Sequence, residues 1–341
     1  MRSNNQSTQT RSVHRVWAIC LAGIIPALAL PSLGAAQQDR PNDQAPGCSL
    51  SKHLVRLTVT VTDKNGRAIE NLQPGDFTIL VKDEPQKLVH FCAEEQPSSV
   101  GILLDTSGSM FGRDKRDKKE LIRSVKETIL HFIEQGLPAN EYFLVAFAQR
   151  PELIADWTNS KNVIGDSLGL LNLPKGPTAL HDALYFGLEK VRQRSNRKQV
   201  LLLITDGDDN TSKHGFEEVA KLTKASDVLV YSLCLTPQME MLGPNGVYAQ
   251  RFLKDLSSAV GGDAFFPANA KQFAQVLDVV AFELRHQYSL GFQPTGIPDG
   301  KWRRIKVELR PIVVKDQQKP DAAPKMTKVN VRTRAGYHAA F

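Results

Sequence analysis

The segment VGILLDTSGS, residues 100–109, decides the fold class because it joins an apolar run to a run of short polar residues. Residues 100–104 hold no polar side chain, which is typical of a strand that is covered on both faces. Asp105, Ser107 and Ser109 follow where this strand should end. Such strands belong to parallel sheets between helices, so the segment predicts an α/β domain with polar groups at the carboxyl edge of its sheet.

The chain after residue 109 continues as an alternation of helices and strands. Apolar residues recur at helical spacing from Leu121 to Ile133, and Gly136 is expected to end this helix. Further strands are predicted at EYFLVAFA, QVLLLITD, VLVYSLCL and DAFFPA, and further helices at residues 178–194, 216–225, 250–260 and 271–286. Alternation of this kind implies right-handed crossovers, so we predict a doubly wound, mostly parallel α/β domain over residues 97–286.

The segments on both sides of this domain have β character, but each has too few strands to bury a core alone. The strands predicted there are LVRLTVTV, DFTILV and KLVHF before the domain, and YSLGFQP, WRRIKVELR and VNVRTRAGYHA after it. Together they are enough for a small sandwich. We therefore predict that residues 53–96 and 287–341 form one β-sandwich into which the α/β domain is inserted.

The N-terminal region has the pattern of an export signal. Basic residues precede an apolar stretch over residues 16–33, and the small residues Gly34, Ala35 and Ala36 follow it. We expect residues 1–36 to be a signal peptide and residues 37–52 to be a linker. The mature chain is then exported and periplasmic or extracellular, with no stable membrane span. Retention of the apolar stretch as a membrane anchor is the alternative.

Composition is that of a globular protein, with 41% hydrophobic and 23% charged residues. The 43 basic and 36 acidic residues give a formal net charge of +7, and three of the basic residues lie within residues 1–36, so the remainder carries +4. A nucleic-acid partner would need a concentrated basic face with interleaved aromatic residues, and the sequence contains no such cluster. We expect no nucleic-acid partner.

The cysteines suggest one disulfide. In an oxidising compartment a pair of the three cysteines outside the apolar N-terminal stretch is expected to close. Cys48 precedes the first predicted strand and Cys92 ends the last strand of the same segment, which makes Cys48–Cys92 the favoured pair. Cys234 lies in an apolar strand and is predicted to be a buried thiol that packs as a small hydrophobic residue.

Two further oxygen-bearing turns belong to the same edge of the sheet as Asp105. Thr178 opens a helix in GPTALHDAL, and Asp206 ends the apolar strand LLLITD. Ligands of open α/β sheets bind at the carboxyl ends of strands, near the point where the strand order reverses. All five donors are hard oxygens, which suit Mg²⁺, Ca²⁺ or Mn²⁺ rather than Zn²⁺. We interpret these residues as a divalent-metal site, with simple helix capping as the alternative.

A cation held mainly by neutral hydroxyl oxygens attracts one more anionic oxygen. If the two carboxylates act through water, a carboxylate of a partner protein can complete the coordination shell. His181 and Asp182 follow Thr178 in the chain. We predict that His181 is a surface histidine without a role in acid–base chemistry. We expect Asp182 to be exposed or to cap a turn, and orientation of a metal-coordinated water is the alternative.

The DTSGS run, the GPT turn and the TDG turn resemble the metal-ion-dependent adhesion site of von Willebrand factor type A domains. That motif is a DxSxS run followed by a later Thr and a later Asp, and it matches Asp105, Ser107, Ser109, Thr178 and Asp206. The flanking segments resemble those of bacterial secreted VWFA-related proteins. The resemblance implies a sheet of order 3-2-1-4-5-6 with one antiparallel edge strand. It also implies that the hydroxyls contact the metal directly, that the two aspartates do so directly or through water, and that a partner Asp or Glu completes the shell.

These observations predict a divalent-metal-dependent protein-binding or adhesion module and not an enzyme. The competing hypothesis is a metal-dependent hydrolase or phosphotransferase of the cell envelope. Phosphatases that form an aspartyl-phosphate at such a strand end need a second acid two residues later, where this chain has Ser107. Turnover that is lost in Asp105→Ala would favour the enzyme. A third hypothesis, a purely structural site, predicts protein capture that is insensitive to a chelator.

Overall fold

The computed structural model describes residues 54–339, except residues 65, 94, 109, 111–114, 172–175, 195, 197, 236–242, 296–297, 312, 315–324 and 327. Ser109, Cys48, the expected signal peptide and the expected linker therefore lie outside the described residues. Within the described part of the chain, no helix combines the length and the apolar character needed to cross a membrane.

A six-stranded sheet in the order β10-β9-β8-β5-β6-β7 forms the centre of the α/β domain. Its strands are β5 (Ser98–Asp105), β6 (Glu141–Phe147), β7 (Pro151–Thr158), β8 (Lys198–Thr205), β9 (Leu229–Cys234) and β10 (Asp263–Phe265). All neighbouring strands are parallel except β6 and β7. Numbered along the domain, this is the order 3-2-1-4-5-6 with an antiparallel edge strand, and the predicted doubly wound sheet is confirmed.

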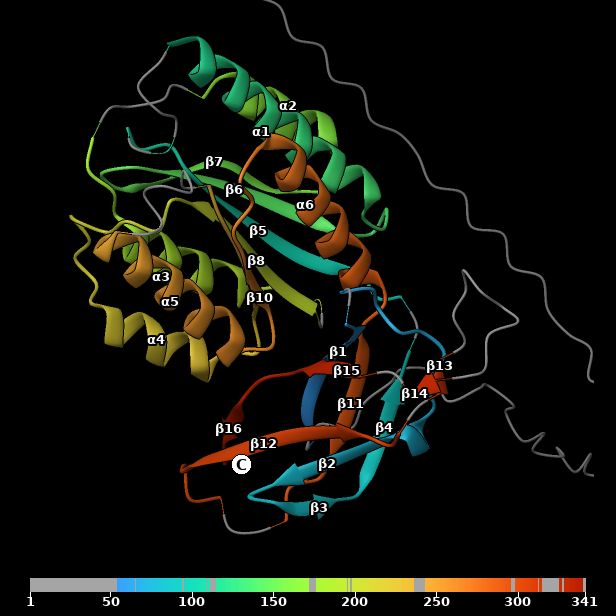
Figure 1. Ribbon diagram of the computed structural model, residues 1–341. Helices are drawn as coiled ribbons and strands as arrows, with labels where there is room; N and C mark the ends of the chain where they lie inside the picture. Colours follow the sequence, from blue (N-terminus) through green and yellow to red (C-terminus); the bar gives the residue numbers. More distant parts are fainter. Residues whose placement is uncertain are drawn as a thin grey trace, which may run out of the picture. The chain divides into compact units, whose positions relative to one another are not determined.

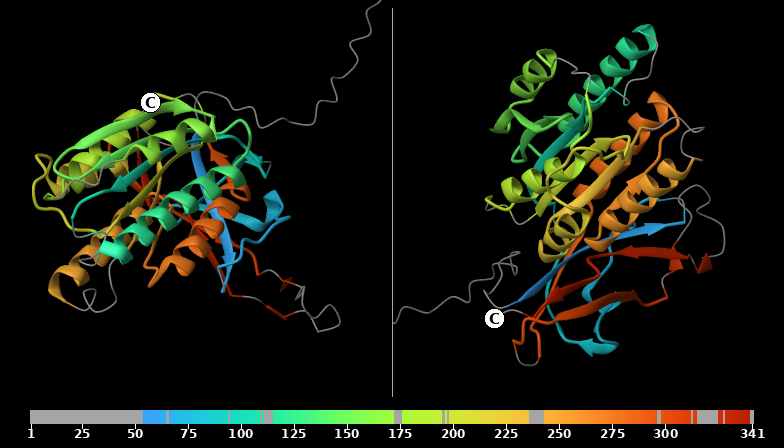
Figure 2. Two further views of the ribbon diagram at one scale, coloured as in Figure 1. Left: turned by 90° about the horizontal axis from the view of Figure 1, so that it is seen from above. Right: turned by 90° about the vertical axis from the view of Figure 1, so that its left-hand side faces the viewer.

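Helices cover both faces of this sheet (Figure 1, Figure 2). One layer consists of α1 (Lys115–Gln135), α2 (Lys161–Gly169) and α6 (Ala270–Arg285). The other consists of α3 (Leu180–Val191), α4 (Phe216–Ala225) and α5 (Pro244–Ala259). Ile102 packs in the first layer and its neighbour Leu103 in the second, because successive strand residues point to opposite faces. This double burial explains why β5 and β8 are continuous apolar runs.

The sequence pattern does not predict β7 or α2. β7 is an edge strand with only Ala155 fully buried, so it shows neither a continuous apolar run nor a clear alternation. α2 has nine residues and buries only Ile164 and Leu168. Its start is fixed by Ser160, whose side chain accepts a hydrogen bond from the Val163 backbone N–H. Short elements with few buried side chains carry too little periodicity to be recognised.

The flanking segments form two four-stranded antiparallel sheets, ordered β15-β1-β11-β4 and β16-β12-β2-β3. Their strands are β1 (Val55–Asp63), β2 (Phe77–Val81), β3 (Glu84–Gln86), β4 (Leu88–Cys92), β11 (Tyr288–Phe292), β12 (Trp302–Leu309), β15 (Val329–Arg332) and β16 (Gly336–His338). A 3-10 turn at Pro74–Asp76 and a short hairpin of β13 (Val313–Val314) and β14 (Lys325–Met326) complete the segments. β1 pairs with β11 and β15, and β2 pairs with β12, so both sheets combine both chain segments. The α/β domain is inserted in this sandwich, as predicted.

The sandwich core is built from alternating strand residues. Leu57, Val59 and Val61 of β1 are buried together with residues of both sheets, including Ile79 and Leu290. A turn follows β1, where Gly66 has φ +79° and the Ile69 N–H donates to the Val61 carbonyl oxygen at 2.8 Å. An isolated bridge between Thr62 and Ala68 extends the pairing. The chain then crosses to the other sheet, so β1 and β2 do not form a hairpin.

A buried polar network connects the sandwich to the α/β domain. Arg332 of β15 donates from Nη2 to Glu283 Oε2 of α6 at 2.5 Å and also pairs with Asp263 of β10. The Tyr231 hydroxyl donates to the same Glu283 oxygen at 3.2 Å. Burial raises the pKa of Glu283, while the charge and hydrogen bond of Arg332 act to lower it. We call Arg332, Glu283, Asp263 and Tyr231 the Glu283 network.

The cysteines agree with the sequence expectations as far as the described residues extend. Cys92 is disulfide-bonded. Its predicted partner, Cys48, lies outside the described residues, so the Cys48–Cys92 pairing stays a prediction. Cys234 is a buried thiol in β9, as predicted, and its Sγ donates to the Asp206 carbonyl oxygen at 3.4 Å.

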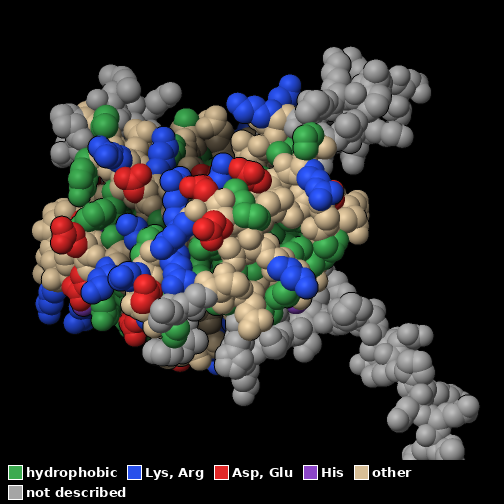
Figure 3. Space-filling model, turned by 90° about the horizontal axis from the view of Figure 1, so that it is seen from below, with side chains coloured by type: hydrophobic (Ala, Val, Ile, Leu, Met, Phe, Trp, Pro, Cys, Tyr) green, Lys and Arg blue, Asp and Glu red, His purple; other side chains and the backbone are tan. Residues whose placement is uncertain are grey.

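Charges of both signs are mixed on the surface. On the face shown in Figure 3, Asp and Glu side chains lie among the Lys and Arg side chains. Two ion pairs on β12 and the loop before it show this. Lys306 and Glu308 are 2.5 Å apart, and Arg303 and Asp299 are 3.5 Å apart.

Candidate metal centre

The two central strands of the sheet end side by side at its carboxyl edge. In the parallel pairing of β5 with β8, Leu104 lies opposite Ile204, so Asp105 and Thr205 end their strands at the same level. From here the chain continues toward β6 on one side and toward β9 on the other. This is the point where the strand order reverses, which is where doubly wound sheets bind ligands.

The Asp105 carboxylate is held by two hydrogen bonds. Oδ1 accepts from the Ser107 backbone N–H at 2.8 Å, and Oδ2 accepts from the Thr205 hydroxyl at 2.7 Å. Asp105, Ser107 and Thr205 are fully buried. The first bond closes a local turn two residues long, and the second joins this turn to the end of β8. These two bonds therefore fix the shape of the DTS turn and the orientation of the Asp105 carboxylate.

Asp206 lies directly after Thr205 and is 8% exposed. Its Oδ1 accepts from the Asp208 backbone N–H at 3.2 Å. Gly207 between them has φ +89°, and a Cβ atom there would lie 2.7 Å from the Ala249 Cβ of α5. Only glycine combines this backbone conformation with so close an approach, which explains the glycine of the TDG turn.

Thr178 is buried and is tied to both neighbouring loops. Its backbone N–H donates to Asn210 Oδ1 at 2.8 Å, and its carbonyl oxygen accepts from the Asn210 N–H at 2.9 Å. The next N–H, of Ala179, donates to the Ala148 carbonyl oxygen at 2.7 Å, and the Thr106 N–H donates to the adjacent Phe147 carbonyl at 2.8 Å. These bonds connect the Thr178 turn to the loop after Asp206 and to the end of β6 beside the DTS turn.

The structure thus places four of the five predicted ligands, Asp105, Ser107, Thr178 and Asp206, on turns at one edge of the sheet. Burial, together with the charge of Asp206, raises the pKa of Asp105 to about 7, although the hydrogen bonds from Ser107 and Thr205 act to lower it. Two buried carboxylates that disfavour each other's charge are stabilised by a nearby cation. The oxygen-only donor set therefore fits a hard divalent ion. Within the described residues, no three His, Cys, Asp or Glu side chains form a metal-type cluster.

A second group of polar side chains fixes the loops around this edge. Asp182 Oδ1 accepts from the backbone N–H groups of Lys213 and His214 at 2.9 Å each and lies 2.8 Å from His214 Nδ1. Burial acts to raise the pKa of Asp182, but the bonds from His214 and Lys213 hold it below its usual value. Asp182 caps this turn, in agreement with one of its two predicted roles.

His181 does not occupy the predicted surface position. Its side chain is 13% exposed, and Nδ1 lies 3.4 Å from Asp209 Oδ2. Its ring packs edge to face on Phe252 of α5, with centroids 5.3 Å apart. The prediction was wrong because the first turn of α3 lies against α4 and α5, and tertiary packing of this kind leaves no local signal. Asp209 also accepts from the His181 N–H at 3.2 Å, so its role in this turn is structural.

Thr205 and Asn210, which hold Asp105 and Thr178 in place, were not predicted from the sequence. Thr205 is recognisable in retrospect as a polar residue at the end of an otherwise apolar strand. Asn210 closes the acidic GDDN turn, and asparagine in such turns often bonds to backbone groups. The partners of Thr205 and Asn210 could not be predicted from the sequence, because they lie far away in the chain.

A groove of about 670 Å³ runs beside α3 and borders these turns. Tyr185 and Phe186 of α3 contribute aromatic surface, and Tyr185 stacks on His214 with ring centroids 3.9 Å apart. Basic side chains contribute to its wall, namely Arg150, Lys190 and Lys213. We call this hollow the α3 groove. It shares Asp182 with the loops that fix the candidate metal centre.

Residues 100–208 match the family model of the von Willebrand factor type A domain. The strand order, the reversal point and the DxSxS-type turn agree with that match. Residues 100–208 therefore match a von Willebrand factor type A domain, and they lie within the α/β domain that is inserted in the β-sandwich.

Two curated proteins illustrate the range of relatives. The chain is 23% identical over 239 residues to calcium-activated chloride channel regulator 4 from Homo sapiens, covering 70% of this chain and 24% of that protein. It is 27% identical over 218 residues to inter-alpha-trypsin inhibitor heavy chain H4 from Sus scrofa, covering 57% and 22%. The chain thus spans less than a quarter of the length of these two relatives.

Two solved structures are similar to parts of the chain. The vWF domain of the type V pili tip protein Mfa5 from Porphyromonas gingivalis is 13% identical, with a TM-score of 0.44, and the match covers 55% of this chain and 95% of that one. Proximal thread matrix protein 1 from the mussel byssus, with a zinc-occupied MIDAS motif, is 17% identical with a TM-score of 0.45, covering 60% and 49%.

Proposed function

We propose that this protein is a divalent-metal-dependent protein-binding module. The cation is Mg²⁺, or Ca²⁺ or Mn²⁺, and its ligands are Asp105, Ser107, Ser109, Thr178 and Asp206. The observation that carries the proposal is a pair of buried carboxylates, Asp105 and Asp206, at the reversal point of a von Willebrand factor type A domain. When bound, the cation supplies positive charge and a coordination position for an anionic oxygen of a partner.

The residues around the site hold the donors in place before any ligand arrives. Thr205 and the Ser107 N–H fix both oxygens of the Asp105 carboxylate. Asn210 fixes the backbone of Thr178 through its side chain and its own N–H. Donors that are already ordered lose little conformational freedom on binding, which supports a site built for a ligand.

The α3 groove supports a partner that presents an acidic residue. Arg150 and Lys190 on its wall are paired with Glu152 and Asp156, which leaves Lys213 to attract a negatively charged segment. The surface of Tyr185 and Phe186 favours an apolar side chain next to it. We propose that a partner Asp or Glu completes the metal shell while the neighbouring residues of the partner occupy this groove.

Binding is favoured over hydrolysis by the residues near the site. Ser107 stands where an aspartyl-phosphate-forming phosphatase needs its second acid. His181 and His214 each face an aspartate, at 3.4 Å and 2.8 Å, and within the described residues no serine or cysteine side chain is hydrogen-bonded to either ring. An exported location is supported by the disulfide at Cys92, because disulfides persist in oxidising compartments.

Calorimetric titration of the chelator-treated protein with Mg²⁺ and Mn²⁺ tests the metal site. We expect one site per chain and at least a tenfold loss of affinity in Asp206→Asn. Asp255→Asn on α5 removes the same charge from an exposed position and should bind as wild type. Equal affinities in the two variants would overturn the assignment.

Affinity capture from the native envelope tests the partner. Wild-type protein should retain a partner with Mg²⁺ but not with EDTA, and Ser107→Ala should retain none under either condition. The captured partner should lose binding when its acidic contact residue is changed to the amide. Capture that survives both EDTA and Ser107→Ala would refute metal-dependent recognition.

A further inference from the structure

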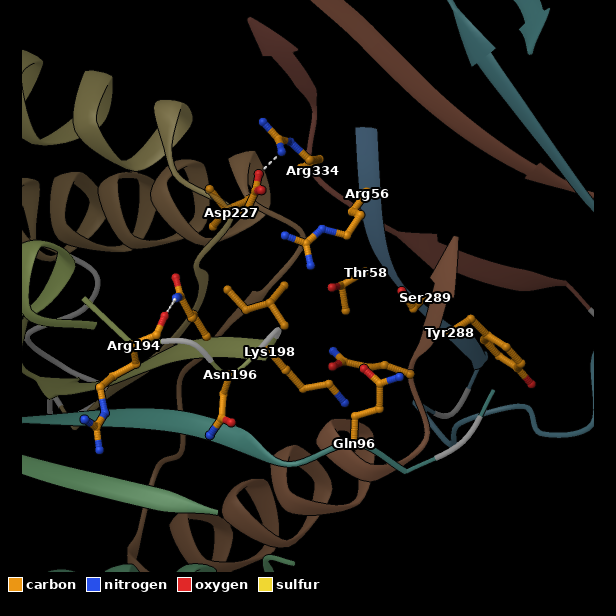
Figure 4. Close-up of a pocket in the computed structure, with 14 residues that line it drawn as sticks. Arg56, Thr58, Gln96, Arg194, Asn196, Lys198, Asp227, Tyr288, Ser289 and Arg334 are labelled. Atoms are coloured by element: carbon orange, nitrogen blue, oxygen red, sulfur yellow. Dashed lines mark hydrogen bonds and ion pairs between the residues drawn. The ribbon is translucent and has the colours of Figure 1, made fainter. Parts of the chain in front are cut away.

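A second cavity, of about 180 Å³, lies at the amino edge of the α/β sheet, opposite the candidate metal centre. The starts of β8 and β9 form one side of it, and β1 and β11 of the sandwich form the other (Figure 4). Among the described residues, its lining contains four basic side chains, Arg56, Arg194, Lys198 and Arg334, but only one acid, Asp227. The cavity therefore carries an excess of positive charge.

Two of the four cations are already neutralised. Arg334 forms an ion pair with Asp227, the acid of the lining. Arg194 donates from Nε to Glu141 Oε1 at 3.0 Å and forms a second bond to the same carboxylate. The excess charge therefore belongs to Arg56 and Lys198.

Lys198 is a buried cation without a counter-ion. Its residue is 8% exposed, and Nζ donates to the Leu284 carbonyl oxygen at 2.5 Å. In the described part of the chain it has no ion pair, and Glu95, whose charge acts on it, is paired with Arg285 at 2.8 Å. Burial lowers the pKa of Lys198 to about 8, so the ammonium is still mostly charged at pH 7. It retains two N–H donors for a further acceptor.

Gln287 contributes a buried acceptor to the same lining. Its Nε2 donates to the Thr60 hydroxyl at 2.9 Å and to the Tyr231 hydroxyl at 3.1 Å. Because the Tyr231 hydroxyl donates its proton to Glu283, it accepts from Gln287, which orients the amide. Its Oε1 has no hydrogen-bond partner among the residues that the structure describes. A buried acceptor of this kind costs free energy unless a donor meets it.

Arg56 stands at the exposed side of the cavity. Within the described residues its guanidinium forms no ion pair or hydrogen bond, so all five of its N–H donors are available. Figure 4 shows Arg56 and Thr58 extending from β1, and Lys198 extending from β8, toward the same space. A ligand of this cavity should therefore carry negative charge for Lys198 and Arg56, and a hydrogen-bond donor for Gln287.

We propose that this cavity binds inorganic phosphate as a protonated oxyanion. Lys198 and Arg56 would bind its anionic oxygens, and Gln287 Oε1 would accept a hydrogen bond from its P–OH group. Sulfate and carboxylates carry no proton at neutral pH and leave Gln287 without a donor. Phosphate monoesters have a second pKa near 6 and have largely lost that proton at pH 7.5, so they are disfavoured for the same reason.

Calorimetric titration of the full chain with phosphate at pH 7.5 tests this site, with EDTA present so that phosphate cannot bind through a metal. We expect saturable binding of one phosphate per chain. Lys198→Met and Arg56→Gln should each weaken it at least tenfold. Arg123→Gln on α1 removes the same charge from an exposed position and should not change it. Thermal unfolding of each variant confirms that it is folded, and Arg56→Gln changes only an exposed side chain.

Two further arms define the ligand and separate this site from the metal centre. Sulfate and methyl phosphate should each bind at least tenfold more weakly than phosphate, and Asp105→Ala should bind phosphate as wild type does. The proposal is overturned if binding is not saturable or if Lys198→Met and Arg56→Gln bind normally. Equal binding of sulfate would overturn the role of Gln287 and the assignment of phosphate.

Discussion

Removal of the Arg332 guanidinium should destabilise the protein strongly, because it leaves a buried carboxylate without its counter-charge. The Glu283 side chain is 4% exposed, and Arg332 Nη2 is its 2.5 Å partner. In Arg332→Met the bond from Tyr231 at 3.2 Å remains. Breaking a buried pair from one side costs about 3–5 kcal/mol, and the lost contact with the half-exposed Asp263 adds less than about 1 kcal/mol. We expect a loss of about 3–5 kcal/mol at pH 8.

The pH dependence of this loss has a definite sign. Burial raises the pKa of Glu283 above its unfolded value, so the folded state binds more protons between the two values. Stability contributed by Glu283 is therefore present at low pH and falls as pH rises through the folded pKa. Without Arg332 that pKa rises further, so the carboxyl is more often neutral at pH 5 than at pH 8, and the loss should be smaller at pH 5.

Urea denaturation of wild type, Arg332→Met and Arg332→Met/Glu283→Gln at pH 5 and pH 8 measures these differences. The double variant should recover most of the loss at pH 8, because its buried side chain is neutral. An unfolding free energy of Arg332→Met within about 1 kcal/mol of wild type at pH 8, or an equal loss at both pH values, would contradict an uncompensated charge on Glu283.

Three other changes have definite expected outcomes. Gly101→Ala would place a Cβ 2.2 Å from the Phe143 ring and should cost about 1–3 kcal/mol in urea denaturation, whereas a neutral effect would contradict the tight packing of β5. Burial lowers the pKa of Lys198 to about 8, so above that pH the unfolded chain binds more protons than the folded chain. The stability of wild type should therefore rise toward pH 10, and Lys198→Met should lack this rise. Parallel profiles of stability against pH in the two proteins would contradict this. Asp182→Ala removes the acceptor of the Lys213 and His214 amides, which should exchange hydrogen at least tenfold faster by mass spectrometry, and unchanged exchange would show that other contacts hold the turn.

The central elements of the fold could be predicted because their burial is visible in the sequence. β5 and β8 are apolar on both faces, and no other element of a soluble domain gives so short and continuous an apolar run. The sandwich could be predicted because each flanking segment has too few strands to bury a core alone, whereas the two segments together have enough. β7 could not be predicted because an edge strand with most side chains exposed has no periodicity to detect.

The position of the candidate ligands at the sheet edge could be predicted from the sequence, but the contacts that hold them there could not. Asp105, Ser107 and Asp206 follow apolar strands, so their position at the sheet edge could be inferred. The bond from Thr205 to Asp105 joins residues 100 positions apart and depends on the register of β5 with β8. The burial of His181 could not be predicted for the same reason, because it depends on Phe252 of a helix far along the chain. Such contacts exist only once the strands and helices are assembled.

We propose that five oxygen donors at one edge of the sheet hold a divalent cation. An anomalous difference map from crystals grown with Mn²⁺ measures this directly. We expect one strong peak per chain, within about 2–2.6 Å of the hydroxyl oxygens of Ser107, Ser109 and Thr178. Asp105 and Asp206 should contact the metal directly or through a water molecule. A map with no peak at this edge at saturating Mn²⁺, or with its peak elsewhere on the chain, would contradict the account.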